Sequence, residues 1–290
     1  MKAQRQSKRR TVRNVAIFTI LTVGVGWLSI WLNGMTGSTD PQQGPGMLLW
    51  LVTPLAVSLL LRACAGDGWR DLGIRPAFKS NLGWYALSIL VYPICISLIL
   101  AIGGAIGAVS FPGFASGGMG LFLQLVAVSF VTNLFKNIFE EFAWRGYLTP
   151  KLRLIGVHDL ANHAIVGLIW AAWHLPYWVG LLDQATMQGF TGLSLPVFIL
   201  LGVLALVTYA VLYGELKLVT GSIWPPLLLH TVGNALTLTL LLEGFVGFPG
   251  SGEAIFTPGM GGILGIVLFT LIGLGVYRRR RMTASGRPST

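Results

Sequence analysis

Residues 195–214, LPVFILLGVLALVTYAVLYG, contain no charged side chain and are almost entirely apolar. A helix rises about 1.5 Å per residue, so a segment of this length crosses the roughly 30 Å hydrocarbon core of a bilayer. Seven similar segments lie near residues 12–32, 46–64, 81–108, 119–139, 162–182, 222–242 and 259–277. The sequence therefore predicts an all-α, polytopic integral membrane protein with about eight transmembrane helices.

The composition supports this fold class. Of the 290 residues, 54% are hydrophobic and 10% are charged, which is too few charges to cover the surface of a soluble protein. The net charge of +10 does not indicate a nucleic-acid partner, because the basic residues lie in short connections and tails rather than on one face of a soluble domain. The lipid bilayer is the partner that this distribution predicts.

The charges also predict which way the helices run. All 20 Lys and Arg residues lie in or beside the two tails and the even-numbered connections between the predicted spans. The charged residues of the odd-numbered connections are all acidic: Asp40, Asp183, Glu243 and Glu253. By the positive-inside rule, both termini are expected to be cytoplasmic. This predicts a multi-pass protein of the cell membrane, and the compact chain with basic tails favours a bacterial inner membrane.

Ionisable side chains near the membrane interior are costly, so each marks a candidate functional site. The first group is FEEFAWR, residues 139–145, at the end of the fourth predicted span. On a helix Glu141 and Arg145 are i,i+4 neighbours in the favourable order, whereas Glu140 lies about 100° further around the axis. The spacing predicts a structural Glu141–Arg145 ion pair and leaves Glu140 to act as a base. The alternative is a pair of glutamates that mark an interfacial helix end.

The second group is WAAWHLP, residues 170–176, in the fifth predicted span. Pro176 cannot donate a helical hydrogen bond to the carbonyl of Ala172, so it is expected to kink the helix near His174. A lone histidine on an apolar helix is more often a packed residue than a catalytic one. A kink beside a polar side chain nevertheless favours a cavity at this point.

The third group is SIWPPLLLHTVGN, residues 222–234, at the start of the seventh predicted span. His230 and Asn234 are four residues apart and therefore share one helix face. An asparagine there often only binds a neighbouring helix. Two other histidines, His158 and His163, lie in a polar connection and are predicted at the surface.

The three segments occur in the order Glu-Glu-x-x-x-Arg, aromatic-x-x-x-His and His-x-x-x-Asn on three separate spans. This combination resembles the CPBP family of CAAX prenyl endopeptidases and bacteriocin-processing (Abi) intramembrane proteases. The resemblance is best over residues 120–240 and extends to WRDLGIR at 69–75. One departure is Trp170, where the family motif usually has phenylalanine, so we expect altered packing with the chemistry retained.

The resemblance implies an intramembrane endopeptidase that hydrolyses a peptide bond of a membrane-associated or prenylated protein. Peptide hydrolysis needs an activated water and stabilisation of the tetrahedral oxyanion. The residues can supply both: Glu140 as the base for water, His174 to orient it, and His230 with Asn234 as oxyanion donors. No cofactor is required by this scheme.

Three alternatives stay open. Glu140, His174 and His230 could together ligate zinc, although the sequence lacks the His-Glu-x-x-His helix of membrane zinc proteases. Buried Glu and His side chains also occur in membrane transporters. The third alternative is a non-catalytic relative of the proteases that acts as a membrane scaffold.

The expected organisation is one membrane domain with three parts. Residues 1–118 form the N-terminal transmembrane helices, residues 119–245 the protease-like core, and residues 246–290 the last helix with a basic cytoplasmic tail. Because Glu140 ends its span and His230 begins its own near the cytoplasmic side, the active site is expected to open to the cytoplasm. Its cavity is expected to reach inward to His174.

Overall fold

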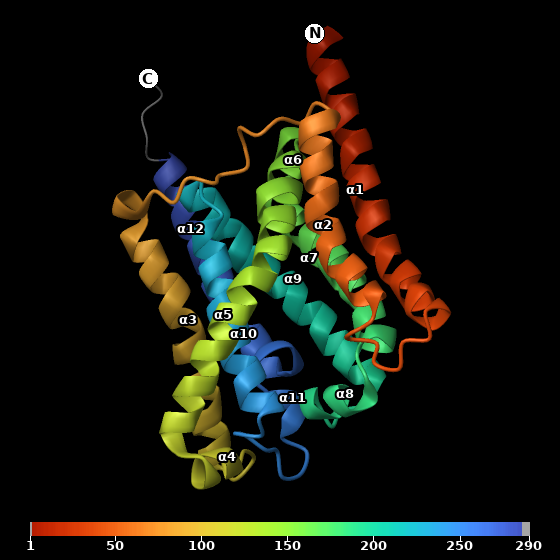
Figure 1. The fold of residues 1–290 in the computed structure, drawn as a ribbon. Coiled ribbons are helices and arrows are strands. Elements are labelled where there is room, and N and C mark those ends of the chain that lie inside the picture. Colours follow the sequence, from red (N-terminus) through yellow and green to blue (C-terminus); the bar gives the residue numbers. More distant parts are fainter. Residues whose placement is uncertain (1, 286–290) are drawn as a thin grey trace.

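The computed structural model describes residues 2–285, and the side chains of residues 6–283. Helices run up and down a single bundle, and the start of the first described helix lies at the same end of it as the finish of the last (Figure 1). We call this the terminal end. Within residues 2–285 no strand forms, and a single isolated bridge pairs Ser110 with Gly247. The predicted all-α class is confirmed. Lys2, Arg5 and Arg287, which contributed to the predicted charge distribution, have side chains outside the described part.

Seven described helices are long and apolar enough to cross a membrane. They contain α1 (Lys2–Met35), α2 (Pro45–Cys64), α3 (Phe78–Ala105), α5 (Gly118–Ala143), α7 (Asp159–Pro176), α9 (Leu195–Thr220) and α10 (Trp224–Leu242). Each agrees with one of the predicted spans.

The helix observed near the eighth predicted span, residues 259–277, differs from the prediction. Residues Gly259–Gly261 form a separate 3-10 turn, η3, and α12 (Ile263–Ser285) begins only after it. Its apolar part, residues 263–277, ends at a run of four arginines and measures about 22 Å at 1.5 Å per residue, shorter than the hydrocarbon core. The helix still returns the chain to the terminal end (Figure 1), so residues 2 and 285, the two described ends of the chain, lie at one end of the bundle. The cytoplasmic side of that end stays a prediction.

Short helices occupy the connections. Four of them cap the end of the bundle away from the termini or join its spans there: α4 (Pro112–Ser116), α8 (Gln184–Phe190), α11 (Glu253–Phe256) and η3. At the other end, α6 (Thr149–Leu154) extends α5 beyond the π-helical turn η1 (Trp144–Leu148). A second π-helical turn, η2 (Tyr177–Leu181), follows Pro176 at the end of α7. The helical geometry therefore changes directly after Pro176, whereas α7 is continuous past His174 and the kink there stays a prediction.

Two glycines let α7 and α9 lie unusually close. A Cβ at Gly167 would lie 2.5 Å from the backbone of Val207, and a Cβ at Gly214 would lie 2.2 Å from the ring of His163. Any larger side chain at either position would force the helices apart. This contact sets the position of the α7 residues that follow, including His174.

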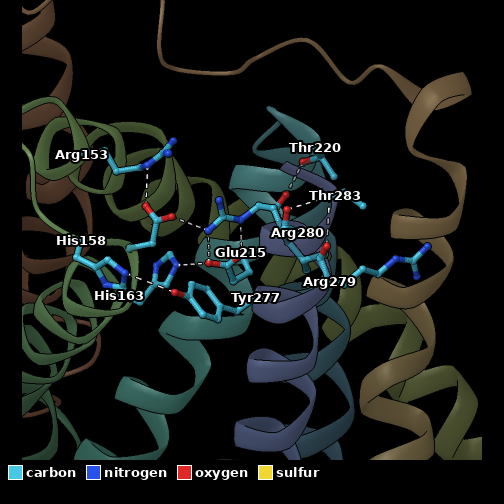
Figure 2. Close-up of polar contacts among 11 residues, drawn as sticks. Arg153, His158, His163, Glu215, Thr220, Tyr277, Arg279, Arg280 and Thr283 are labelled. Atoms are coloured by element: carbon cyan, nitrogen blue, oxygen red, sulfur yellow. Dashed lines mark hydrogen bonds and ion pairs between the residues drawn. The ribbon is translucent and has the colours of Figure 1, made fainter. Parts of the chain in front are cut away.

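A buried polar network ties α12 to this helix pair (Figure 2). Arg280 donates to both carboxylate oxygens of Glu215 on α9, at 2.6 and 3.0 Å, and to Asp159 at 2.6 Å. His163, predicted at the surface, is instead fully buried with its Nε2 2.9 Å from Glu215. That prediction was wrong because the carboxylate partner lies 52 residues away on another helix. His158 is exposed, as predicted.

Candidate active site

The two adjacent glutamates end α5 and point to different partners. Both are buried, with 1% of Glu140 and none of Glu141 exposed. The chain widens into the π-helical turn η1 directly afterwards, and such turns are frequent at functional sites. Successive helical residues are rotated by about 100°. The two carboxylates therefore face different neighbours, as the spacing predicted.

Glu141 is the centre of a fully buried ion pair. Its Oε1 accepts from Arg145 Nη1 at 2.9 Å, and neither side chain is exposed. The same oxygen lies 2.9 Å from Nδ1 of His230. The guanidinium of Arg145 lies over the rings of Trp170 and Tyr213, 4.3 and 4.7 Å from their centroids. Glu141 thus joins α5 to α10 through His230, while Arg145 packs against α7 and α9.

Glu140 has a different set of contacts. Its Oε2 accepts from the indole N–H of Trp170 at 2.8 Å, and its Oε1 lies 3.5 Å from the ammonium of Lys136. Lys136 is 36% exposed, so this ion pair is partly solvated. The phenylalanine usual at position 170 in the family motif could not make the indole hydrogen bond. The substitution therefore adds a polar contact to the candidate base, beyond the altered packing that the sequence predicted.

The backbone fixes the protonation pattern of His174. Its Nδ1 lies 2.9 Å from the carbonyl oxygen of Trp170, which can only accept, so Nδ1 carries the proton. In the neutral ring Nε2 is then an acceptor. His230 has its Nδ1 against the carboxylate of Glu141, which likewise places a proton on Nδ1. When that imidazole is charged, its Nε2–H is also a donor.

Sequence reasoning missed Asn137, a fully buried residue of α5. Its Oδ1 accepts from Asn234 Nδ2 at 3.1 Å, and its own amide lies 3.5 Å from Thr231 Oγ1. The contact orients the Asn234 amide and joins α5 to α10 one turn before Glu140. The only sequence signal was the i,i+3 spacing of Asn137 and Glu140.

A cavity of about 280 Å³ brings the predicted catalytic residues together. Glu140, His174, His230 and Asn234, from three different helices, all line it. Aromatic and aliphatic side chains form much of the rest of the wall: Tyr92, Trp170, Tyr177, Phe190, Leu206, Tyr209, Tyr213, Leu238, Leu242 and Met260. The four residues therefore face one largely apolar chamber.

The cavity extends in a direction that differs from the prediction. Its wall includes Gln42 of the α1–α2 connection, Thr186 of α8 and Met260 of η3, which all lie away from the terminal end. On the terminal side, Trp144 and Arg145 are fully buried and fill the space. No residue of η1 or α6 lines the cavity, so its described wall reaches away from the terminal end, and the opening toward the cytoplasm stays a prediction.

Zinc was the alternative for this site, and imidazole and carboxylate are suitable zinc ligands. Among the described side chains, no group of three or more His, Cys, Asp or Glu is placed to hold a metal ion. Glu140 Oε2 and the Nδ1 atoms of both site histidines already contact protein groups. These contacts leave Glu140 Oε1 and the Nε2 atoms of both histidines uncommitted, and zinc-bound histidines commonly donate their other ring N–H in this way. Zinc therefore stays an alternative, with Glu140, His174 and His230 as the residues that would hold it, and the chemistry below is derived from the side chains alone.

Comparison with known proteins supports the reading of the motifs. Residues 121–236 match the family described as type II CAAX prenyl endopeptidase Rce1-like. No curated protein matches the chain. The matched segment includes Glu140, Glu141, His174, His230 and Asn234, and it agrees with the predicted resemblance to the CAAX prenyl endopeptidases. Residues 121–236 of this polytopic membrane protein form a domain of the Rce1-like, type II CAAX prenyl endopeptidase family.

Proposed function

We propose that the protein is an intramembrane endopeptidase that hydrolyses a peptide bond with a water activated by Glu140. The observation that carries the proposal is the convergence of Glu140, His174, His230 and Asn234 on one cavity. A peptidase is the activity that the family assignment supports. The division of roles between these residues rests on their hydrogen bonds.

In the proposed reaction, Glu140 and His174 hold the attacking water. The Oε1 side of Glu140 makes only the partly solvated contact with Lys136, so it is the side that can take the water's proton. Nε2 of His174 accepts the second hydrogen of that water, since its Nδ1 is committed to a carbonyl. Two acceptors on one water direct its lone pair toward the substrate carbonyl.

His230 and Asn234 are the proposed donors to the oxyanion. In this role His230 acts as an imidazolium, with its Nδ1–H bound by Glu141 and its Nε2–H as the donor to the oxyanion. The Asn234 amide has two N–H groups and gives one to Asn137, which leaves the second for the oxyanion. Preorganised donors of this kind are worth about 10²–10³-fold in turnover each. Glu140 returns its proton to the leaving amine.

The cavity wall supports an apolar substrate segment at the membrane. A peptide bond in a membrane-associated or prenylated protein fits this lining, and the direction of the cavity favours a segment that enters away from the terminal end. A bacterial inner membrane with cytoplasmic termini remains the proposed location, from the charge distribution.

The direct test is cleavage of a fluorogenic, farnesylated CAAX peptide and of a transmembrane peptide by purified protein in lipid nanodiscs. Glu140→Gln and His174→Ala should abolish cleavage. Glu243→Gln is the matched control, because Glu243 is exposed at the end of α10 and outside this cavity. If Glu140→Gln and His174→Ala cleave at the wild-type rate, the roles proposed for these residues are wrong. If the wild-type protein cleaves neither peptide, the transporter or scaffold alternative replaces this proposal.

A further inference from the structure

A second pocket, of about 490 Å³, lies at the terminal end and shares no residue with the candidate active site. Three segments form it: the α2–α3 connection, α6, and the end of α9. The lining residues are Arg70, Asp71, Gly73, Pro150, Arg153, Leu154, Lys217, Leu218 and Gly221. Three of these nine side chains are basic and one is acidic.

The acidic residue is already neutralised. Asp71 binds Arg62 at 2.6 Å and Lys151 at 2.8 Å, and both partners are almost completely buried. Burial alone would raise the pKa of Asp71, but the hydrogen bonds and positive charge of Lys151 and Arg62 outweigh it and hold the pKa below 3.8. Asp71 is therefore ionised. Its single negative charge already faces the positive charges of Arg62 and Lys151, neither of which lines the pocket.

Lys217 is a buried cation without a carboxylate of its own. It is 5% exposed, and its ammonium donates to the carbonyl oxygen of Leu72 at 2.6 Å. Among the described residues it forms no ion pair, because the nearby Asp71 is bound by Arg62 and Lys151. A buried charge that is not paired is costly, so this position favours an anionic ligand.

Arg70 and Arg153 flank the opening. Arg70 is exposed, and the described part of the chain shows no hydrogen bond or ion pair for it. Arg153 is paired with Asp159 at 2.9 Å, but that carboxylate also binds Arg280 (Figure 2). The pocket therefore carries positive charge that its own carboxylates do not balance.

Exposed apolar side chains lie next to the basic residues of this pocket. Leu154 is 63% exposed at the end of α6. Two more large side chains stand out from the α2–α3 connection beside Arg70 and Gly73, with Trp69 50% and Ile74 54% exposed. Exposed tryptophan next to basic residues is typical of the headgroup region of a bilayer. Such surroundings suit an acyl chain attached to a phosphate.

We infer that this pocket binds the phosphate of one anionic phospholipid, with Lys217 and Arg70 as its principal contacts. Basic pockets between transmembrane helices on the cytoplasmic side are known to hold anionic headgroups, and the basic terminal end of this chain is the end predicted to be cytoplasmic. The phosphate would supply the counter-charge that Lys217 lacks.

The pocket wall is joined to α10, which carries His230 and Asn234, and the connection that forms it is also joined to η1. Gly73 O accepts from Ile223 N at 2.9 Å, which fixes the start of α10. Arg62 donates to the carbonyl oxygen of Gly146, in η1 directly after Arg145. A headgroup that holds the α2–α3 connection in place would therefore steady both α10 and η1, so its loss is expected to lower thermal stability.

Native mass spectrometry of the full-length protein tests the inference, with phosphatidylglycerol or phosphatidylcholine titrated into the detergent solution. We expect one phosphatidylglycerol per chain to be retained in preference to phosphatidylcholine. Loss of a charged hydrogen bond should weaken this binding about tenfold in Arg70→Gln. Arg75→Gln is the matched control, an exposed arginine of the same connection that does not line the pocket. Lys217→Gln should weaken binding at least as much as Arg70→Gln.

Two results would overturn the inference. Equal binding by the Arg70→Gln and Arg75→Gln proteins would mean that the lipid is attracted only by the general charge of this end. Displacement of phosphatidylglycerol by millimolar inorganic phosphate would assign the pocket to a free anion rather than to a lipid. Because Arg70 is exposed, its replacement leaves the fold intact, so the test does not depend on the buried Lys217.

Discussion

Replacing the two adjacent glutamates in turn should separate stability from catalysis. Glu140→Gln and Glu141→Gln change the same side chain in the same way at neighbouring positions of α5. The structure gives them opposite surroundings. Glu141 holds the fully buried Arg145 and contacts His230, whereas Glu140 faces the cavity with a partly exposed Lys136 beside it.

The magnitudes follow from burial. Breaking a buried ion pair by neutralising one partner costs about 3–5 kcal/mol, because the other charge stays buried. A glutamine at position 141 could still accept one hydrogen bond, so we expect the lower end, about 3 kcal/mol. At roughly 2–4 °C per kcal/mol, the unfolding midpoint of Glu141→Gln should fall by about 10 °C. For Glu140→Gln the lost ion pair is partly solvated and worth about 1 kcal/mol or less.

The activities should follow the reverse order. Removing a general base costs about 10²–10⁴-fold in turnover, so Glu140→Gln should be inactive at nearly wild-type stability. Thermal unfolding and cleavage of the fluorogenic peptide are measured on the same nanodisc preparations. The reasoning is refuted if Glu140→Gln keeps turnover, or if Glu141→Gln unfolds at the wild-type temperature.

Three further predictions follow from individual contacts. Trp170→Phe removes the indole hydrogen bond to Glu140 and should lower kcat about tenfold with little change in KM. Trp173→Phe, on the same helix, controls for lost ring volume. It loses a 3.4 Å contact to the carbonyl oxygen of Trp50 and part of its packing on Trp50 and His174, but no hydrogen bond to Glu140, so an equal loss of kcat in both variants would indicate general packing. Chelators should leave cleavage unchanged, since no described group of three ligands can hold a metal; bound stoichiometric zinc whose removal stops cleavage would contradict this. The lowered pKa of Asp71 contributes stability that is complete above pH 3.8 and is lost as the pH falls through the pKa of the folded state. Asp71→Asn should therefore flatten the acid side of the profile of unfolding temperature against pH. An unchanged profile would contradict this.

Features encoded within one helix could be predicted from the sequence. The seven long spans, the Glu141–Arg145 pair and the change of helical geometry at Pro176 all depend on spacing along a single segment. Contacts between helices could not be predicted in this way. Glu215, the partner of His163, lies 52 residues away, and Asn234, the partner of Asn137, lies 97 residues away. Neither pair has a spacing that a single sequence can reveal.

The last span shows a different limit. Hydropathy alone joined residues 259–277 into one segment, but Gly259–Gly261 turns before the helix and Arg278 follows only 15 residues after its start. Lysine and arginine extend long side chains toward an interface, so a short apolar stretch with basic residues after it can still reach the headgroups. The common end of the bundle at which the described chain begins and ends was therefore predicted better than the bounds of the last span.

The direction in which the cavity extends depends on the volume of the side chains around it. The depth of a residue along its helix gives no measure of that volume. His230 is six residues from the start of α10, and that depth suggested an opening at the terminal end. On this side Trp144, Arg145 and Leu148 of η1 are fully buried, and none of them lines the cavity. If the termini are cytoplasmic, as the charges predict, the attacking groups meet the substrate from within the bilayer or from its far side. A substrate that spans or enters the membrane satisfies this geometry directly. A prenylated carboxyl terminus would first have to pass beneath α8 or between the helices to reach the cavity. The ratio of the cleavage rates of the transmembrane peptide and the farnesylated peptide therefore measures which of the two routes the cavity serves.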